Sequence, residues 1–177
     1  MDTFVEQIVK KKKEGKEIAI VIAVWFLFVI VLAVGILFLG TIGLVLAAAA
    51  GYGAWWLATG QNKEFEYSIT NGSIDVDEII AQRKRKRLVS VNGEKIESAG
   101  VYNAAELANR PFDRRVMAAP SANEEGLWYF TYHSKKIGHT MVLFQPDDRV
   151  LAAFKDSLPK LLQLELSRKY GNGSTAS

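Results

Sequence analysis

The sequence predicts a membrane α-hairpin of two transmembrane helices, joined to an α+β domain of six or seven antiparallel strands and a C-terminal amphipathic helix. Three observations support this fold class. Residues 18–59 contain no Asp, Glu, Lys, Arg or His. Several short segments after residue 62 alternate between polar and apolar residues, which is typical of half-buried strands. Residues 147–170 instead carry apolar residues at helical spacing.

The uncharged run is too long for a single membrane span. An apolar run of more than about 18 residues predicts a transmembrane helix. Residues 18–59 would form a straight helix of ~63 Å, about twice the ~30 Å thickness of the hydrocarbon core. The run must therefore fold back, and Gly40-Thr41-Ile42-Gly43 is the helix-weakening segment near its middle. We expect one helix over residues 18–39 and a second over residues 42–59.

Basic residues flank the run on both sides. Lysines occupy positions 10–13 and 16, Lys63 follows the run, and the turn at residues 40–43 carries no charge. Because Lys and Arg collect on the cytoplasmic side, the sequence predicts a multi-pass protein of the bacterial cell membrane with both termini cytoplasmic. Aromatic residues near the end of the second helix fit the belt at the inner interface: Tyr52, Trp55 and Trp56.

Small residues recur every four positions along the second predicted helix, at Gly43, Ala47 and Gly51. Such a stripe allows two helix backbones to approach closely. Two interpretations stay open at this point. The stripe is a helix-packing face, or the alanine-rich segment is simply apolar.

Residues 1–17 are predicted to form a short amphipathic segment on the cytoplasmic side. Thr3 and Glu6 match the capping-box pattern that begins many helices. Apolar residues follow at i, i+4 spacing: Phe4, Val5, Ile8 and Val9. The segment either lies in the headgroup region as a helix or is a frayed terminus whose lysines only set topology.

Residues 62–170 are predicted to form the β domain, with strands over residues 64–70, 73–81, 88–91, 112–119, 127–133 and 137–145. Asn71-Gly72 and Asn92-Gly93 are strong hairpin-turn signals. The basic run at residues 83–87 is expected in a turn. Residues 94–111 show no clear period apart from one helical turn at residues 103–108.

The last predicted element is a helix that begins at Pro146-Asp147-Asp148, is kinked by Pro159 and ends at Gly171. Residues 171–177 are expected to form a disordered tail. The predicted core of the domain comprises Phe65, Tyr67, Ile69, Ile74, Val76, Val142, Phe144, Leu151, Phe154, Leu158 and Leu161.

Neither composition nor motifs indicate an enzyme. The chain has no Cys, and its two histidines, His133 and His139, are too few for a typical zinc site. Nucleophile-elbow, zinc-protease and phosphate-loop motifs do not occur. We therefore expect no catalytic residues, no metal and no cofactor. The net charge of +3 comes from local clusters, so nucleic acid is not an expected partner.

Two stretches resemble a known domain family. The segment at residues 67–91, with its Asn71-Gly72 turn and its basic run, resembles the opening strands of bacterial pleckstrin-homology-like (PH-like) domains. Residues 142–150 resemble the last strand of these domains where it runs into the helix. The whole chain, through residues 1–15, 61–62 and 83–87, resembles a family of small bacterial two-span membrane proteins classed as a domain of unknown function. This resemblance implies a split β-barrel capped by a helix, placed C-terminal to the hairpin and used for binding rather than catalysis.

Two function classes remain open from the sequence. One is a membrane-anchored, non-enzymatic binding or scaffold module for an unidentified protein partner or the inner-leaflet surface. The other is a structural accessory subunit that packs through its hairpin against a larger membrane complex. The candidate contact with anionic lipid headgroups or a partner is the run Arg83, Lys84, Arg85, Lys86 and Arg87. The alternatives for this run are a topology signal or pairing with acidic residues such as Asp75 and Asp77.

Overall fold

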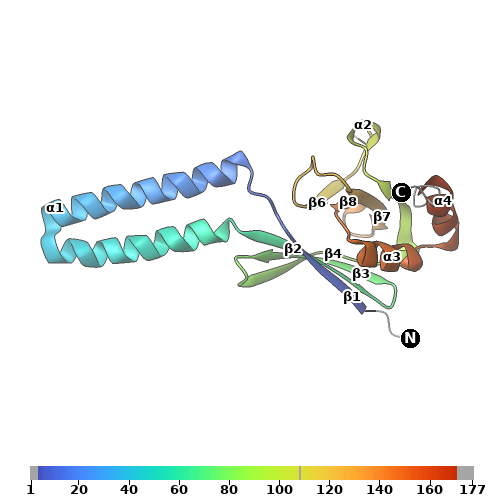
Figure 1. Cartoon of the computed structure of the whole chain (residues 1–177), viewed down its shortest axis with the longest axis horizontal. Helices are drawn as coiled ribbons and strands as arrows, with labels where there is room; N and C mark the ends of the chain where they lie inside the picture. The colour runs from blue at the N-terminus through green and yellow to red at the C-terminus, as the bar shows by residue number, and fades with distance from the viewer. Residues whose placement is uncertain (1–3, 108, 171–177) are drawn as a thin grey trace, which may run out of the picture. The chain divides into compact units, whose positions relative to one another are not determined.

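The computed structural model describes residues 4–107 and 109–170 and divides the chain into two compact units (Figure 1). We call residues 4–10, 64–79 and 85–170 the β domain, and Lys11–Lys63 with Ile80–Lys84 the hairpin unit. The β domain is therefore discontinuous in sequence, because the hairpin unit is inserted after its first strand. This corrects the expected order of an anchor followed by a separate domain at residues 62–170. The predicted tail at residues 171–177 lies outside the described residues.

The first segment is a strand, β1 (Phe4–Lys10), where the sequence analysis predicts an amphipathic helix. Along its whole length β1 pairs antiparallel with β2 (Lys63–Thr70), which follows the hairpin in sequence. Residues four apart share a face in a helix and also in a strand, so the apolar spacing alone does not distinguish the two. The non-local ladder with β2 decides the conformation. Thr3 of the predicted capping box lies outside the described residues.

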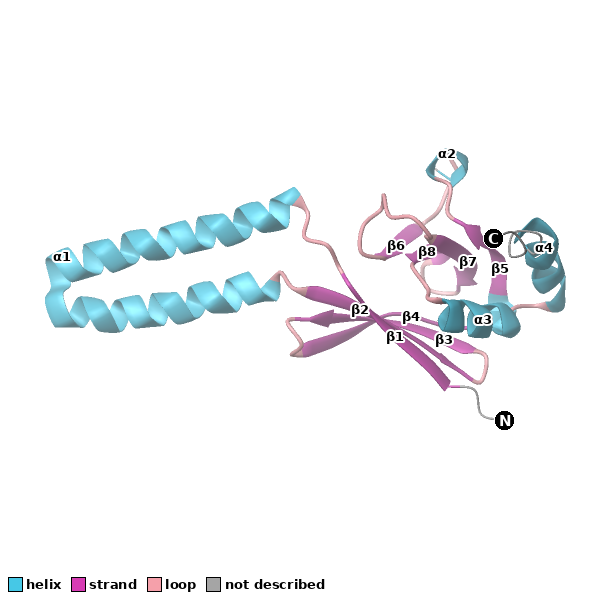
Figure 2. Cartoon of the chain, in the orientation of Figure 1, coloured by secondary structure: helices cyan, strands magenta, loops and turns pink. Residues whose placement is uncertain are grey.

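β1 completes a four-stranded sheet of order β1-β2-β3-β4, with β3 (Ser73–Ile80) and β4 (Lys84–Asn92) (Figure 2). Asn71 and Gly72 join β2 to β3 with positive φ values of 48° and 81°, as a two-residue hairpin turn requires. β4 begins earlier than predicted, because most of the basic run belongs to the strand rather than to the preceding turn.

The second sheet has the order β5-β7-β8-β6. Its strands are β5 (Ile96–Val101), β6 (Arg114–Ala118), β7 (Trp128–Ser134) and β8 (Gly138–Phe144). β6 runs parallel to β8, so the expectation of antiparallel strands throughout is wrong for this pair. β5 follows a 3-10 turn, η1 (Gly93–Lys95), and precedes a short helix, α2 (Ala104–Leu107). The sequence does not reveal β5 because a register shift between Ile96 and Ser98 interrupts its alternation.

The described residues thus contain eight strands in two sheets, rather than six or seven in a single split barrel. One apolar core draws side chains from both sheets and from the helix α3 (Asp148–Ser157). Its centre is a group of three phenyl rings, Phe130, Phe144 and Phe154, with centroids 5.1 to 5.6 Å apart. Nine of the predicted core residues are buried, namely Phe65, Tyr67, Ile69, Ile74, Val76, Val142, Phe144, Phe154 and Leu158, and Leu151 is partly buried.

The predicted C-terminal helix is two helices, α3 and α4 (Lys160–Tyr170). Asp147 caps α3 by accepting a hydrogen bond from the Val150 N–H at 2.7 Å. Leu158 has an extended backbone (φ −77°, ψ 159°), because a residue that precedes proline is disfavoured in the helical region. The chain therefore changes direction at Pro159. Leu161 is 77% exposed as a result, which corrects its expected place in the core.

Leu158 and Leu161 form a matched pair for testing this break. Leu158→Ala should lower the free energy of unfolding by about 2–5 kcal/mol, because its side chain is 4% exposed. Leu161→Ala should change it by less than about 0.5 kcal/mol, as expected of a surface position. Denaturant unfolding of the full chain in detergent, followed by circular dichroism, measures both. Equal losses would mean that α3 and α4 form one continuous amphipathic helix.

The uncharged run lies in one helical element, α1 (Gly15–Gly60), rather than in two separately bounded helices. The helical backbone of α1 is broken at Gly40 (φ 54°, ψ −127°), within the segment expected to form the turn. The two arms then lie side by side (Figures 1 and 2), and a Cβ placed on Gly43 would meet the carbonyl oxygen of Gly35 at 1.9 Å. α1 is long and apolar enough to cross a membrane.

Candidate functional site

The five basic residues of the predicted contact have different surroundings in the structure. Arg83 lies before β4 and belongs to the hairpin unit, whereas Lys84, Arg85, Lys86 and Arg87 are the first four residues of β4. Successive side chains of a strand point to opposite faces, so the two arginines of β4 alternate with its two lysines. The run therefore divides into Arg83, the two arginines of β4 and its two lysines, Lys84 and Lys86, which are exposed.

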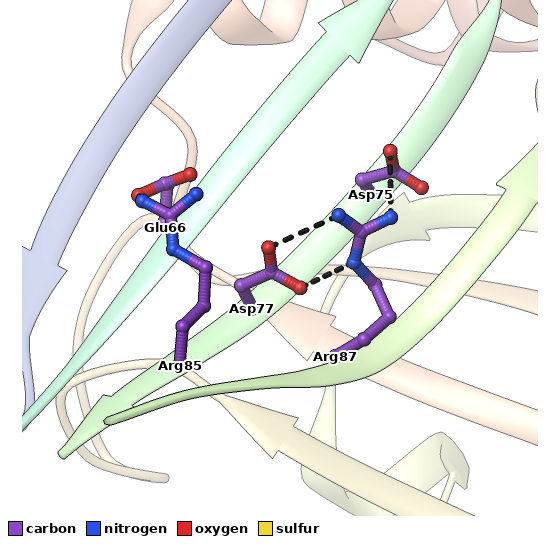
Figure 3. A network of polar contacts seen from close by, with 5 residues as sticks. All are labelled: Glu66, Asp75, Asp77, Arg85 and Arg87. Carbon is purple, nitrogen blue, oxygen red and sulfur yellow. Dashed lines mark hydrogen bonds and ion pairs between the residues drawn. The ribbon is translucent and has the colours of Figure 1, made fainter.

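Arg85 and Arg87 form ion pairs with carboxylates of the neighbouring strands (Figure 3). Arg85 Nη2 lies 2.5 Å from Glu66 Oε2 on β2. Arg87 Nη1 lies 2.9 Å from Asp75 Oδ2 on β3, and its Nε and Nη2 donate to the two carboxylate oxygens of Asp77. Such two-pronged pairing suits the planar guanidinium group. We call these five residues the acid–arginine network.

Burial makes this network structurally important. Glu66 and Asp77 are each only 4% exposed, so their carboxylates depend on the arginines for compensation. Burial raises the pKa of Glu66 above its ordinary value, and the positive charge of Arg85 opposes that rise. The hydrogen bond to Asp77 raises the pKa of Arg87. Arg85 and Arg87 thus form ion pairs within the sheet, although their side chains are 58% and 52% exposed. Arg87 pairs with Asp75 and Asp77, which is one of the alternatives left open for this run.

Arg83 has aromatic partners instead. Its guanidinium carbon lies 4.0 Å from the ring centroid of Trp56 and 5.3 Å from that of Trp55, which is the geometry of a cation–π contact. The Arg83 Nη2 group also donates a hydrogen bond to Thr59 Oγ1. All four residues belong to the hairpin unit, where they fix the turn between β3 and β4 to the last helical turns of α1.

The three small residues of α1 face the other arm of the hairpin. Gly43 and Ala47 are buried, and Gly43 lies against Gly35. A Cβ on Gly51 would lie 3.0 Å from the ring of Phe28. The small-residue stripe therefore packs against the other arm of the same chain, rather than being exposed to another protein.

The chain matches a known protein family over most of its length. The model of a family described as Bacterial PH-like domain (DUF6106) matches residues 1–163, which include β1, the hairpin and both sheets. The chain belongs to this family. In the DUF6106 protein, β1 and the inserted hairpin therefore lie inside the family unit together with the strands that follow them. No curated protein and no solved structure matches the chain.

The two histidines of the DUF6106 protein face each other across the β7–β8 ladder. His139 Nε2 lies 3.3 Å from Glu97 Oε2, and its ring packs against Phe112 with centroids 5.0 Å apart. Among residues 4–107 and 109–170, no group of three or more His, Cys, Asp or Glu side chains is placed to hold a metal ion. The expected lack of catalytic, metal and cofactor sites stays a prediction.

Sequence reasoning missed three partners of the basic run. Glu66 lies in a perfectly alternating strand and reads as an ordinary solvated position, although it is the buried partner of Arg85. Trp55 and Trp56 were assigned to an aromatic belt, but nothing local linked them to Arg83, which lies beyond two intervening strands. The signal in the sequence was an aromatic pair at the end of the uncharged run together with a basic cluster in one short chain.

Proposed function

We propose that the DUF6106 protein is a membrane-anchored, non-enzymatic module that presents its PH-like domain for binding or scaffolding at the cytoplasmic surface of the bacterial cell membrane. The insertion of an apolar hairpin between β1 and β2 carries this proposal. The hairpin unit begins and ends on adjacent strands, where the Lys11 N–H donates to the Lys63 carbonyl oxygen at 2.9 Å. The chain thus enters and leaves the hairpin at one place, and the domain holds the anchor by two covalent connections.

The surface of the hairpin favours a lipid-facing anchor over an accessory subunit. Its small-residue face is occupied internally, whereas large apolar side chains cover the outer surface. Leu37 and Phe38, next to the break at Gly40, are 78% and 79% exposed. Because exposed apolar side chains on this scale are unstable in water, lipid is the natural environment for these arms. The basic residues at both ends support a cytoplasmic location for those ends.

Cysteine labelling tests the proposed topology, and the absence of native cysteines makes each introduced thiol unique. Thr41→Cys, at the tip of the hairpin, should react with a membrane-impermeant maleimide in intact cells. Lys136→Cys, in the exposed turn between β7 and β8, should react only after permeabilisation. Labelling of Lys136→Cys in intact cells would contradict the cytoplasmic placement of the β domain.

Photo-crosslinking from the outer surface separates the anchor from the accessory subunit. A benzophenone amino acid at Phe38 should give lipid adducts or no discrete adduct if the hairpin faces the bilayer. The same probe at Phe130 in the buried core provides a control that cannot reach lipid. A single abundant protein adduct from position 38 would replace the anchor model with a subunit of a larger complex.

A further inference from the structure

The turn that carries Arg83 has an unfavourable backbone for its sequence. Ala81 and Gln82 have positive φ values of 53° and 56°, and the Arg83 N–H donates to the Ile80 carbonyl oxygen at 3.0 Å. This is the two-residue hairpin turn for which Asn-Gly is strongly preferred, as at Asn71-Gly72. Residues other than glycine in this region store strain, which points to a function for the conformation. The Ala81 N–H also donates to the Asn62 carbonyl oxygen at 2.7 Å, so the turn is attached to the end of α1.

In this conformation the Arg83 side chain contacts the rings of Trp55 and Trp56 and donates a hydrogen bond to Thr59. The Thr59 hydroxyl donates back to the carbonyl oxygens of Trp55 and Trp56, at 2.8 and 3.1 Å. It is therefore oriented to accept from Arg83. A guanidinium group has five N–H donors. Stacking on the rings occupies its face and leaves edge donors for a further acceptor.

Arg83 lies beside the end of α1, and this position indicates what kind of acceptor its free N–H donors would meet. Trp55 and Trp56 end an uncharged run of membrane-spanning length, and paired aromatic residues at such a place lie at the level of the lipid headgroups. Arg83, Lys84 and Lys63 add positive charge to the same unit. Among the described residues no carboxylate forms an ion pair with Arg83, in contrast to Arg85 and Arg87.

We propose that Arg83, held on Trp55 and Trp56, binds the phosphate of an anionic phospholipid at the cytoplasmic leaflet. The proposal rests on the proposed function, since it needs the end of α1 to lie at a membrane interface. It assigns lipid recognition to one residue of the basic run and removes Arg85 and Arg87 from that role. A planar guanidinium binds a phosphate through two N–H groups, which an ammonium group does not reproduce.

Native mass spectrometry of the full chain in mild detergent tests this assignment. We expect the wild-type protein to retain phosphatidylglycerol in preference to phosphatidylcholine. Arg83→Gln should weaken that preference about fivefold, the equivalent of the energy of one basic residue near an anionic surface. Lys136→Gln removes the same charge from an exposed turn of the β domain and should leave the preference unchanged. Equal weakening in both variants would replace the site with diffuse attraction.

Three further measurements distinguish the remaining explanations. Arg83→Lys retains the positive charge, so it provides a folded variant even if Arg83→Gln fails to fold. It should still lose part of the lipid preference, because an ammonium group lacks the two parallel N–H donors of a guanidinium group. An unchanged preference in Arg83→Lys would overturn a guanidinium–phosphate contact. Millimolar inorganic phosphate should not displace the lipid, and displacement would identify a site for free phosphate instead. Alkaline extraction separates the two proposals: a wild-type chain that leaves the membrane refutes the anchor, whereas an anchored chain with an Arg83-independent preference refutes only this site.

Discussion

Deleting β1 together with the hairpin should strongly destabilise the β domain, whereas deleting the hairpin alone should leave the domain stable and independent of detergent. The first variant begins at residue 62, so it lacks both β1 and α1. The second joins residue 11 to residue 63 through Asn-Gly, which replaces the hairpin by a short turn where Lys11 and Lys63 are already hydrogen bonded. We expect the variant without β1 to lose roughly 3–5 kcal/mol, a large part of the typical 5–15 kcal/mol stability of a domain.

The expected loss has three sources in β1. Val5 and Val9 pack against the main core, and the backbone ladder covers the edge of β2. The Gln7 side chain donates to the Gln145 carbonyl oxygen at 3.2 Å and accepts from the Asp147 N–H at 2.7 Å, which ties β1 to the start of α3. Urea unfolding followed by circular dichroism compares the two variants.

The two faces of β1 provide a matched control in the hairpin-free variant. Val5→Ala with Val9→Ala should be clearly destabilising. Phe4→Ala with Ile8→Ala should have little effect, because these side chains are 64% and 53% exposed. If the variant without β1 unfolds at the same urea concentration as the hairpin-free variant, β1 is not part of the domain.

Gly43→Leu should force the two arms of α1 apart. A Cβ at this position would lie 1.9 Å from the Gly35 carbonyl oxygen, and a backbone atom has no rotamer by which to move away. The arms must therefore separate by roughly 2 Å or more, toward the spacing of about 8–10 Å found for ordinary helix pairs. Gly53→Leu is the matched control on the same arm, because a Cβ at Gly53 meets nothing within 4 Å.

Spin labels at Leu27→Cys and Tyr52→Cys report the separation of the arms. Both positions are exposed, at 61% and 63%, so the labels do not disturb the packed face. We expect one short distance in the parent and in Gly53→Leu, and a longer, broader distribution in Gly43→Leu. An unchanged distance in Gly43→Leu would mean that the arms do not pack through this glycine pair.

Local sequence patterns predict the structure correctly where an element pairs with the next element along the chain. The alternation of residues 64–70 and the Asn71-Gly72 turn predict β2 and β3 correctly, because a tight turn leaves one antiparallel register. The length of the uncharged run predicts a break in α1, since it exceeds one bilayer crossing, and the glycines at positions 40 and 43 locate that break. Pro159 marks the end of α3 through its restriction on Leu158.

The basic run shows where local information ends. Its position before a strand of alternating residues is visible in the sequence, and so is the nearby pair of Asp75 and Asp77. The partner of Arg85 on β2 and the stacking of Arg83 on Trp56 are not, because each depends on which strands and turns meet after folding. One stretch of five cations therefore supplies an ion-pair network and an aromatic-bound arginine.

The apolar hairpin, the β2–β3 pair and the helical C-terminal region can all be predicted from the amino-acid sequence. Each of these follows from hydrophobic periodicity or from a turn whose energetics are local. Three features depend on contacts between distant segments and become visible only in the folded chain: Phe4–Lys10 is a strand, β6 runs parallel to β8, and the hairpin interrupts the PH-like domain. A four-residue apolar spacing suits helix and strand equally, and the ladder to β2 across the inserted hairpin removes the ambiguity.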